Sequence, residues 1–268
     1  MSLGGDMSGS DARFVGVDWA IGGWFSIGFD ADGRCEFRFG RFADLAEHYR
    51  KATLILVDIP IGLPCGEYER RRCDGEARDY VRKRLRSVFW TPPRFAVERS
   101  YRAKANGVTP EEHKNILLEL NASRPKGEKL TIQAWNIAPM IAEVDAVLRS
   151  PSFQGLGSVR EVHPEVCFRA LSRGKAVAPK KAGQRISPEG MEQRIQILGD
   201  FEPRAREIYD LALARYSQQA APDDILDALA AVLTAQLGYP DKLRTLPANP
   251  PKDEYGLPME MVFYNPTS

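Results

Sequence analysis

The sequence predicts an α/β fold, and three segments carry that prediction. Phe14–Val17 and Leu54–Val57 are short and apolar throughout, as expected for strands that are buried on both faces of a sheet. Each of them is followed by an aspartate. Near the end of the chain, Ile225–Leu237 has the length of a helix and only three polar side chains, so we expect a helix that is buried nearly all round.

The elements between the two apolar strands follow from hydrophobic periodicity. Trp24–Phe29 and Arg34–Phe39 are further strand candidates, and the Asp30–Gly33 segment between them has the composition of a hairpin turn. Phe42–Ala52 places apolar residues at helical spacing. The expected order is therefore strand, strand, strand, helix, strand.

The middle of the chain has a different character. Glu67–Lys104 contains twelve basic and six acidic residues, with helical spacing and turn signals mixed, which indicates a helical insertion or lid. An amphipathic helix is expected at Ile137–Leu148 and a short strand at Ser158–Val162. Ser172–Pro188 is a loop with five basic residues and no acidic one, and Met191–Tyr216 is mostly helical.

The length of 268 residues favours one large domain or two small ones. We predict one domain over residues 13–240, with its helical insertion at about 65–135. Residues 1–12 are rich in glycine and serine and are expected to be a disordered leader or a cloning remnant, not a signal peptide. Residues 241–268 form a proline-rich C-terminal extension.

Charge and composition exclude some classes of protein. The 37 basic and 36 acidic residues nearly cancel, which excludes a surface that is basic throughout but leaves room for a basic groove. No apolar stretch approaches the roughly 18 residues of a membrane span, so we expect no membrane partner. The four cysteines form no paired motif and are expected to be reduced thiols in a cytoplasmic protein.

Four aspartates are candidates for chemistry. Asp18 and Asp58 each follow an apolar strand, where open α/β sheets place their ligands. Asp224 and Asp227 lie three residues apart on the first turn of the buried helix. Capping of that helix accounts for one aspartate, Asp223 or Asp224, but not for Asp227. Together the carboxylates form an oxygen-only cluster of the kind that Mg²⁺ or Mn²⁺ prefers, and two such ions could act in phosphoryl displacement.

Several motifs in this order resemble one family. They are Gly16-Val-Asp18-Trp-Ala, Asp58-Ile-Pro-Ile-Gly-Leu-Pro64, Arg72-Cys-Asp74-x-x-Ala77-Arg78, Ser87-Val-Phe, Glu161-Val-His-Pro-Glu165 and Asp223-Asp-x-x-Asp227-Ala. The chain is similar, from about Phe14 to about Leu237, to an uncharacterised domain-of-unknown-function family that is predicted to be a nuclease of the RNase H-like fold. The resemblance implies a mixed five-stranded sheet with flanking helices, in which the first, fourth and fifth strands are neighbours.

The resemblance also assigns roles to single residues. Asp18 matches the metal ligand of the first strand, Asp58 the acidic residue of the fourth strand, and Asp224 and Asp227 the acids of the final helix. It places Glu161 on the fifth strand, near the same edge of the sheet. His163 could then support a metal ligand, although a histidine beside a proline is more often a structural hydrogen-bonding residue.

Two basic segments are candidates for contact with nucleic acid. Arg94, Arg99 and Arg102 alternate with aromatic residues, a combination that can neutralise phosphates while bases stack. The alternative is an amphipathic insertion with solvated charges and inward-facing rings. Lys180 and Lys181 form a second candidate, with an ordinary solvated loop as its alternative.

The leading functional prediction is a metal-dependent nuclease that hydrolyses phosphodiester bonds by a two-metal mechanism. The choice between DNA and RNA stays open, and a homodimer is possible because resolvase-like enzymes often act as dimers. One alternative is a non-catalytic protein of the same fold that binds nucleic acid or another ligand. A phosphotransferase of the actin and sugar-kinase type is a weaker alternative, because no glycine-rich phosphate loop directly follows Asp18.

Overall fold

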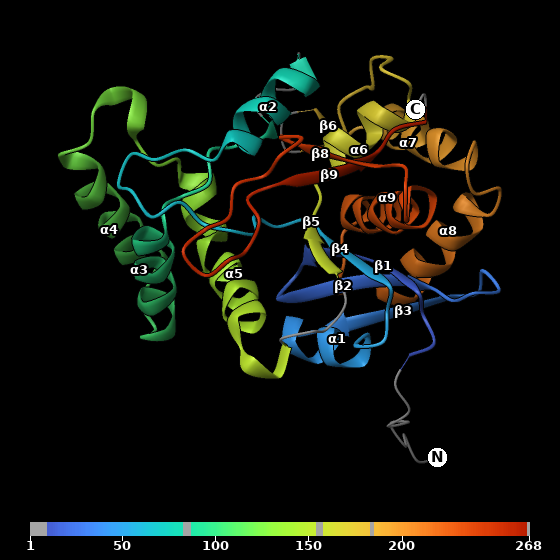
Figure 1. The fold of residues 1–268 in the computed structure, drawn as a ribbon, viewed down its shortest axis with the longest axis horizontal. Coiled ribbons are helices and arrows are strands. Elements are labelled where there is room, and N and C mark those ends of the chain that lie inside the picture. Colours follow the sequence, from blue (N-terminus) through green and yellow to red (C-terminus); the bar gives the residue numbers. More distant parts are fainter. Residues whose placement is uncertain (1–9, 83–86, 154–157, 183–184, 267–268) are drawn as a thin grey trace.

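The computed structural model describes residues 10–82, 87–153, 158–182 and 185–266. Its centre is a mixed five-stranded sheet in the order β3-β2-β1-β4-β5, which confirms the predicted α/β class (Figure 1). The strands are β1 (Phe14–Ala20), β2 (Gly23–Phe29), β3 (Cys35–Gly40), β4 (Leu54–Val57) and β5 (Ser158–Glu161). β4 runs parallel to β1 and to β5, whereas β2 and β3 are antiparallel. The first, fourth and fifth strands are therefore neighbours, as expected.

β1 is longer than the sequence pattern indicates. It continues through Asp18 to Ala20, because β1 and β2 form a tight hairpin in which Asp18 pairs with Phe25 and Trp19 with Trp24. Asp18 thus lies within a strand and not directly after one. Asp58 does follow its strand as predicted.

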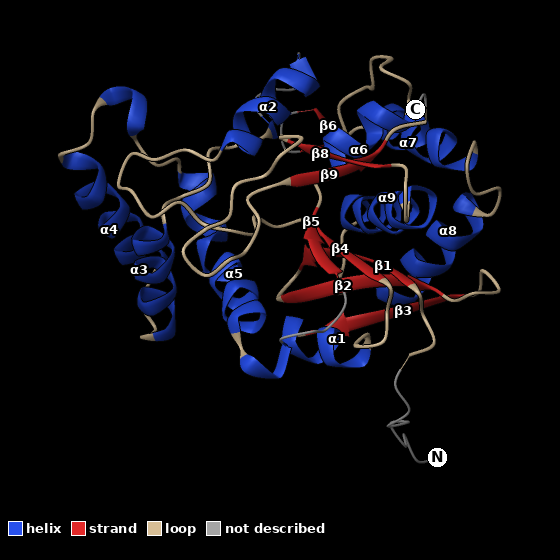
Figure 2. Cartoon of the chain, in the orientation of Figure 1, coloured by secondary structure: helices blue, strands red, loops and turns tan. Residues whose placement is uncertain are grey.

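Helices cover both faces of the sheet (Figure 2). On one face, α1 (Phe42–His48) and α5 (Ile132–Arg149) pack against Val15, Val17 and Trp24. The other face is covered by α9 (Pro222–Gly238), which is buried almost all round as predicted. The helices α6 (Pro164–Leu171), α7 (Pro188–Gly199) and α8 (Ala205–Tyr216) surround α9.

The middle of the chain forms the expected helices. They are α2 (Arg72–Val81), α3 (Arg94–Ala105) and α4 (Pro110–Ala122), followed by the short 3₁₀ turns Lys126–Glu128 and Pro151–Phe153 on either side of α5. α3 packs on α4 and α5, and these helices stand at one side of the sheet (Figure 1). β6 (Lys181–Ala182) and β7 (Arg185–Ile186) pair in the basic loop region.

The two ends of the described chain return to the core. β8 (Leu243–Leu246) and β9 (Met261–Tyr264) form an antiparallel pair, and Val262 bridges to Val162 just after β5. The predicted disordered leader lies outside the described residues up to position 9. Its last residues are ordered, since Ser10 donates a backbone hydrogen bond to His48 and Ala12 is buried. Among the described residues, no helix is long and apolar enough to cross a membrane.

Candidate metal centre

Three carboxylates meet at one edge of the sheet. Asp18 on β1, Asp58 after β4 and Asp227 on α9 each offer one oxygen, and these oxygens lie within 4.8 Å of one another. Val17 pairs in parallel with Val57, so the residues that follow them, Asp18 and Asp58, lie at the same height along the sheet. The Asp58 amide also donates to the Val17 carbonyl at 2.9 Å. Three elements far apart in the sequence thus place their acids at one point.

The close approach of α9 to β1 depends on Gly16. A Cβ atom at this position would overlap the Ala228 carbonyl oxygen and the Val232 amide, and would lie 2.9 Å from the Ala231 Cβ. Glycine therefore allows the helix backbone to rest directly on the strand. This contact brings the first turns of α9, and with them Asp227, against Asp18.

Burial raises the pKa of all three carboxyls, and repulsion between them adds to this for Asp18 and Asp58. For Asp18 the largest cause is burial, followed by the charges of Asp58 and Asp227. Burial and Asp227 act on the pKa of Asp58 in the same direction, and burial raises the pKa of Asp227. Acids that are buried together need a compensating cation, because each charge otherwise destabilises the others.

Lys180 supplies one such cation. Its ammonium contacts the Asp227 carboxylate and lies 3.8 Å from an oxygen of Asp223. Burial lowers the pKa of Lys180, but the charges of Asp227 and Asp18 raise it by more, so the side chain stays protonated. The sequence makes Lys180 a candidate for contact with phosphate. In the structure its ammonium lies beside the acids of the pocket.

The carboxylates retain free oxygens that suit a metal ion. Asp18 Oδ1 accepts from the Trp19 amide at 2.7 Å, and no donor to the Asp58 carboxylate exists among the described residues. Asp227 Oδ1 is buried and likewise has no hydrogen-bond partner in this part of the chain. An oxygen-only set with an unsatisfied buried oxygen fits Mg²⁺ or Mn²⁺.

Asp224 stands at the margin of this cluster. Its carboxylate accepts from the Ala221 amide at 2.9 Å, so it caps α9, as the capping alternative anticipated for one of the two aspartates. It also lines the pocket into which the three acids open, and burial, more than the charges of Asp223 and Asp227, raises its pKa to about 6. Asp224 therefore adds negative charge without joining the three converging oxygens.

Glu161 is close to the cluster but is fully engaged elsewhere. It ends β5, and its two oxygens accept from Arg71 at 2.6 Å and 2.9 Å, while the Ile61 amide donates to it at 2.7 Å. Its pKa is raised to about 7, chiefly by burial. The structure thus pairs Glu161 with Arg71, and its oxygens are not among the three that converge.

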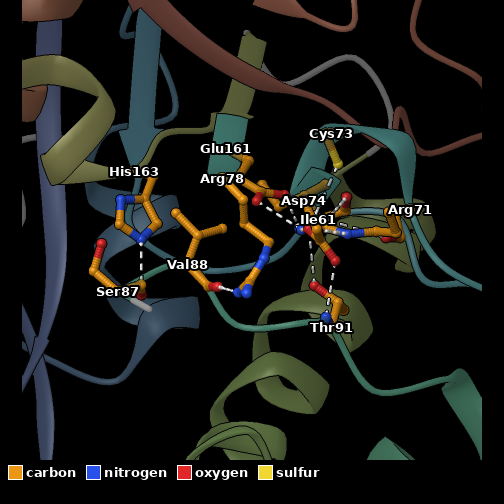
Figure 3. A network of polar contacts seen from close by, with 11 residues as sticks. Ile61, Arg71, Cys73, Asp74, Arg78, Ser87, Val88, Thr91, Glu161 and His163 are labelled. Carbon is orange, nitrogen blue, oxygen red and sulfur yellow. Dashed lines mark hydrogen bonds and ion pairs between the residues drawn. The ribbon is translucent and has the colours of Figure 1, made fainter. Parts of the chain in front are cut away.

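Arg71 joins Glu161 to the segment that follows it. The guanidinium is buried and also contacts Asp74 Oδ1 at 2.5 Å, and Asp74 Oδ2 accepts from the Thr91 amide at 2.8 Å (Figure 3). In the sequence, Arg71 stands out only as one of the many basic residues of its segment. This network fixes α2 and the Thr91 segment to the end of β5.

His163 caps α6 and does not reach the three carboxylates. Its Nδ1 accepts from the Glu165 amide at 3.2 Å, and Nε2 lies 3.4 Å from the Ser87 carbonyl, which requires the proton on Nε2 (Figure 3). Burial is the largest cause that lowers its pKa, so the ring is neutral. These contacts fit the structural alternative.

Glu165 and Arg194 were not identified from the sequence as site residues. Glu165 lines the pocket from the first turn of α6, and the buried Arg194 of α7 donates to it at 2.7 Å. Glu165 ends the Glu161-Val-His-Pro-Glu165 motif, but nothing in the sequence indicates its partner. Glu165 lies on the first turn of α6, where an acid also stabilises the helix dipole. Its position in the sequence therefore does not distinguish a site residue from one that stabilises the helix.

The acids open into a pocket of about 450 Å³. Its lining combines these acids with apolar side chains, which include Trp19, Ile59, Phe89, Ile137, Met140 and Met261. With a cation held by the acids, a ligand with an anionic part and a flat apolar part would fit the pocket.

The predicted nucleic-acid contacts on α3 do not line this pocket. Arg94 is only 6% exposed and pairs with Asp145 and Asp253, each at 2.7 Å, so it cannot reach a surface phosphate. Arg99 and Arg102 are exposed but pair with glutamates, at 3.3 Å and 3.1 Å. Lys181 lies in β6, and its side chain is outside what the structure describes.

One protein family matches most of the chain. The family model described as a protein of unknown function, DUF429, matches residues 16–252, and the chain belongs to that family. Comparison with curated proteins and with solved structures gave no match.

Proposed function

We propose that this member of the DUF429 family is a divalent-cation-dependent nuclease that hydrolyses phosphodiester bonds at Asp18, Asp58 and Asp227. The single observation that carries the proposal is the convergence of these carboxylate oxygens within 4.8 Å in a pocket. The strand order and directions support it further, because they are those expected for an RNase H-like fold.

Each carboxylate has a role in this proposal. Asp18, Asp58 and Asp227 would hold Mg²⁺ or Mn²⁺, and Asp224 would keep the site electronegative from its margin. The bound ions would act as Lewis acids and lower the pKa of the attacking water, as in the two-metal mechanism. Neither a histidine nor a cysteine is needed as nucleophile.

Lys180 has a second task in the same proposal. It is the ammonium group among the acids, and its contact with Asp227 balances charge before a cation binds. With a cation bound at the acids, Lys180 would be available to contact the substrate phosphate. The ion pair between Lys180 and Asp227 would thus be replaced by two contacts, one between Asp227 and the metal ion and one between Lys180 and the polyanion.

The pocket supports a nucleic-acid substrate. The apolar side chains Trp19 and Phe89 are suited to a sugar and base, whereas the acids would bind the phosphate by way of a cation. We place this activity in the cytoplasm, in agreement with the four cysteines, which are free thiols. The cleavage experiment decides between DNA and RNA as the substrate, and a homodimer, the form suggested by the resemblance, is tested by a separate measurement of the oligomeric state.

The experiment compares the protein with two substituted forms. Labelled single-stranded, duplex, hybrid and branched DNA and RNA are incubated with Mg²⁺, Mn²⁺ or chelator. Asp58→Asn tests the site, and Asp210→Asn, on the exposed face of α8, is the matched control. We expect cleavage that needs the cation, is retained in Asp210→Asn and falls at least about a hundredfold in Asp58→Asn.

Two results would contradict the proposal. Equal cleavage by Asp58→Asn would place any activity elsewhere or in a contaminant. Binding of nucleic acid in chelator, with no cleavage under any condition, would favour the non-catalytic alternative.

A further inference from the structure

A second pocket lies next to the metal centre. It has a volume of about 470 Å³ and is formed by the end of α2, by α6 and by the loop at 174–179. α2 and α6 are in contact, and both lie beside the basic loop (Figure 1). The hydrolysis proposed at the three aspartates does not involve this pocket.

The lining of this pocket is positively charged. Arg82, Arg169 and Lys175 line it, and none of them forms an ion pair within the part of the chain that the structure describes. The one acid in the described lining is Glu165, which Arg194 already neutralises at 2.7 Å. Three cations without counter-ions in one concavity form a site for an anion.

The arginines of α3 provide a contrast. Arg94, Arg99 and Arg102 all pair with acidic side chains. The position of a residue in the basic segment therefore does not show whether it is paired. Arg82 belongs to the same segment, has no ion pair among the described residues and lines the second pocket.

The loop that forms this pocket is held firmly by α7. The Ala178 amide donates to Gln193 at 2.6 Å, and Arg194 donates to the Ala178 carbonyl at 2.5 Å. At Gly190, a Cβ atom would overlap the Pro179 carbonyl, so only glycine allows this approach. These contacts give the wall that carries Lys175 a defined position.

The same elements connect the two pockets. Glu165 lines both of them, while the adjacent residues Pro179 and Lys180 line one pocket each. An extended ligand held in the first pocket can therefore continue into the second. A polymer with repeated anionic groups has the required form.

We propose that the pocket of Arg82, Arg169 and Lys175 binds a backbone phosphate of the nucleic-acid strand whose neighbouring phosphodiester lies at the metal centre. This inference rests on the proposed function. Guanidinium groups bind phosphate oxygens in a bidentate fashion, and the described lining contains no aromatic ring on which a base could stack. The contact is thus to the backbone and independent of base sequence.

The test measures binding without cleavage. Fluorescein-labelled single strands of DNA and of RNA, each about 20 nucleotides long, are titrated with protein in chelator over a series of salt concentrations. The double variant Arg169→Gln/Lys175→Gln removes two cations of the pocket. Arg99→Gln/Lys104→Gln removes the same charge from exposed positions on α3.

We expect the pocket variant to bind about tenfold more weakly and to lose about 0.7 from the slope of log affinity against log salt, because the pocket holds one phosphate and each phosphate contact to a single strand contributes roughly 0.7. The α3 variant should stay within about twofold of the unsubstituted protein. Thermal melting of both variants confirms that they are folded.

Three results would overturn the inference. These are unchanged binding by the folded pocket variant, an equal loss in the α3 variant, or no binding of either oligonucleotide. The proposed function can fail separately: if no cation supports cleavage but the pocket variant alone weakens binding, the phosphate site stands and the nuclease does not. Cation-dependent cleavage with equal binding by all forms supports the nuclease and eliminates the phosphate site.

Discussion

Lys180 is the residue whose replacement tests the electrostatics of the site most directly. Its ammonium contacts Asp227 and opposes the rise in pKa that burial and repulsion impose on Asp18 and Asp58. In Lys180→Met, the carboxylates keep their burial and lose this cation. We expect the variant to be less stable than the unsubstituted protein at about pH 7.5 in chelator.

The size of the effect follows from the burial of the pair. Removal of one partner from a buried ion pair costs roughly 3–5 kcal/mol. The Lys180 side chain is 26% exposed and that of Asp227 3%, so partial screening reduces the expected loss to about 2–3 kcal/mol. In a protein of this size, such a loss lowers the melting temperature by about 4–12 °C.

The pH dependence has a definite sign. The pKa values of Asp18, Asp58 and Asp227 in the folded protein lie above their ordinary values, so the folded state binds more protons than the unfolded state in that interval. The contribution of these groups to the free energy of unfolding therefore falls as pH rises from about 4. Lys180→Met raises these pKa values further, so its deficit should be largest at about pH 7.5 and should shrink towards about pH 5.

Differential scanning fluorimetry and urea denaturation measure both effects. Lys175→Met is the matched control, because it removes an exposed lysine of the same loop that has no ion pair among the described residues, and it should change stability by less than about 0.5 kcal/mol. Mg²⁺ or Mn²⁺ at about one hundred times its Kd should stabilise Lys180→Met by about 2.7 kcal/mol relative to the same variant in chelator. The prediction fails if Lys180→Met in chelator matches Lys175→Met at every pH, or if its deficit grows as pH falls.

Three further predictions concern the scaffold. Gly16→Ala should destabilise the protein by about 3 kcal/mol, since its methyl group would overlap the α9 backbone, while Gly199→Ala, with open space around it, should be neutral or slightly stabilising in urea denaturation. Arg71→Met leaves two buried carboxylates unpaired and should cost about 3–5 kcal/mol, whereas the exposed Arg72→Met should cost less than about 0.5 kcal/mol; comparable losses would contradict the structure. Asp224→Asn keeps an acceptor at the cap but removes a group whose pKa is about 6. Between about pH 4.5 and 7 in chelator, the free energy of unfolding of the unsubstituted protein should fall by about 2 kcal/mol more than that of Asp224→Asn. Parallel profiles of unfolding free energy against pH for the two proteins would refute the raised pKa of Asp224.

The parts of the fold that could be predicted are those with strong local patterns. The apolar runs Phe14–Val17 and Leu54–Val57 lie in central strands, and the apolar helix at Ile225–Leu237 is α9. The true end of β1 could not be found in this way. Asp18 and Trp19 continue the strand because β2 folds back onto them, and that pairing is a tertiary effect.

The candidate site was predictable to the extent that acids border or interrupt apolar segments. Asp18, Asp58 and Asp227 stand out because a carboxylate next to apolar residues needs a reason to be there, and the structure brings these three together. Glu161 satisfied the same criterion, yet Arg71 neutralises it. A sequence pattern identifies buried charges but does not identify their partners.

The partners decide what each charge can do, and they come from distant segments. Arg194 on α7 fixes Glu165 and the Ala178 carbonyl together, and thereby positions the loop that delivers Lys180 to Asp227. Lys180 beside the metal centre and Lys175 of the second pocket are therefore positioned by the same contacts. A substitution at Arg194 would disturb both pockets at once, so the separate functions of the pockets are best tested at Lys175 and Asp58, whose side chains take no part in these contacts of Arg194.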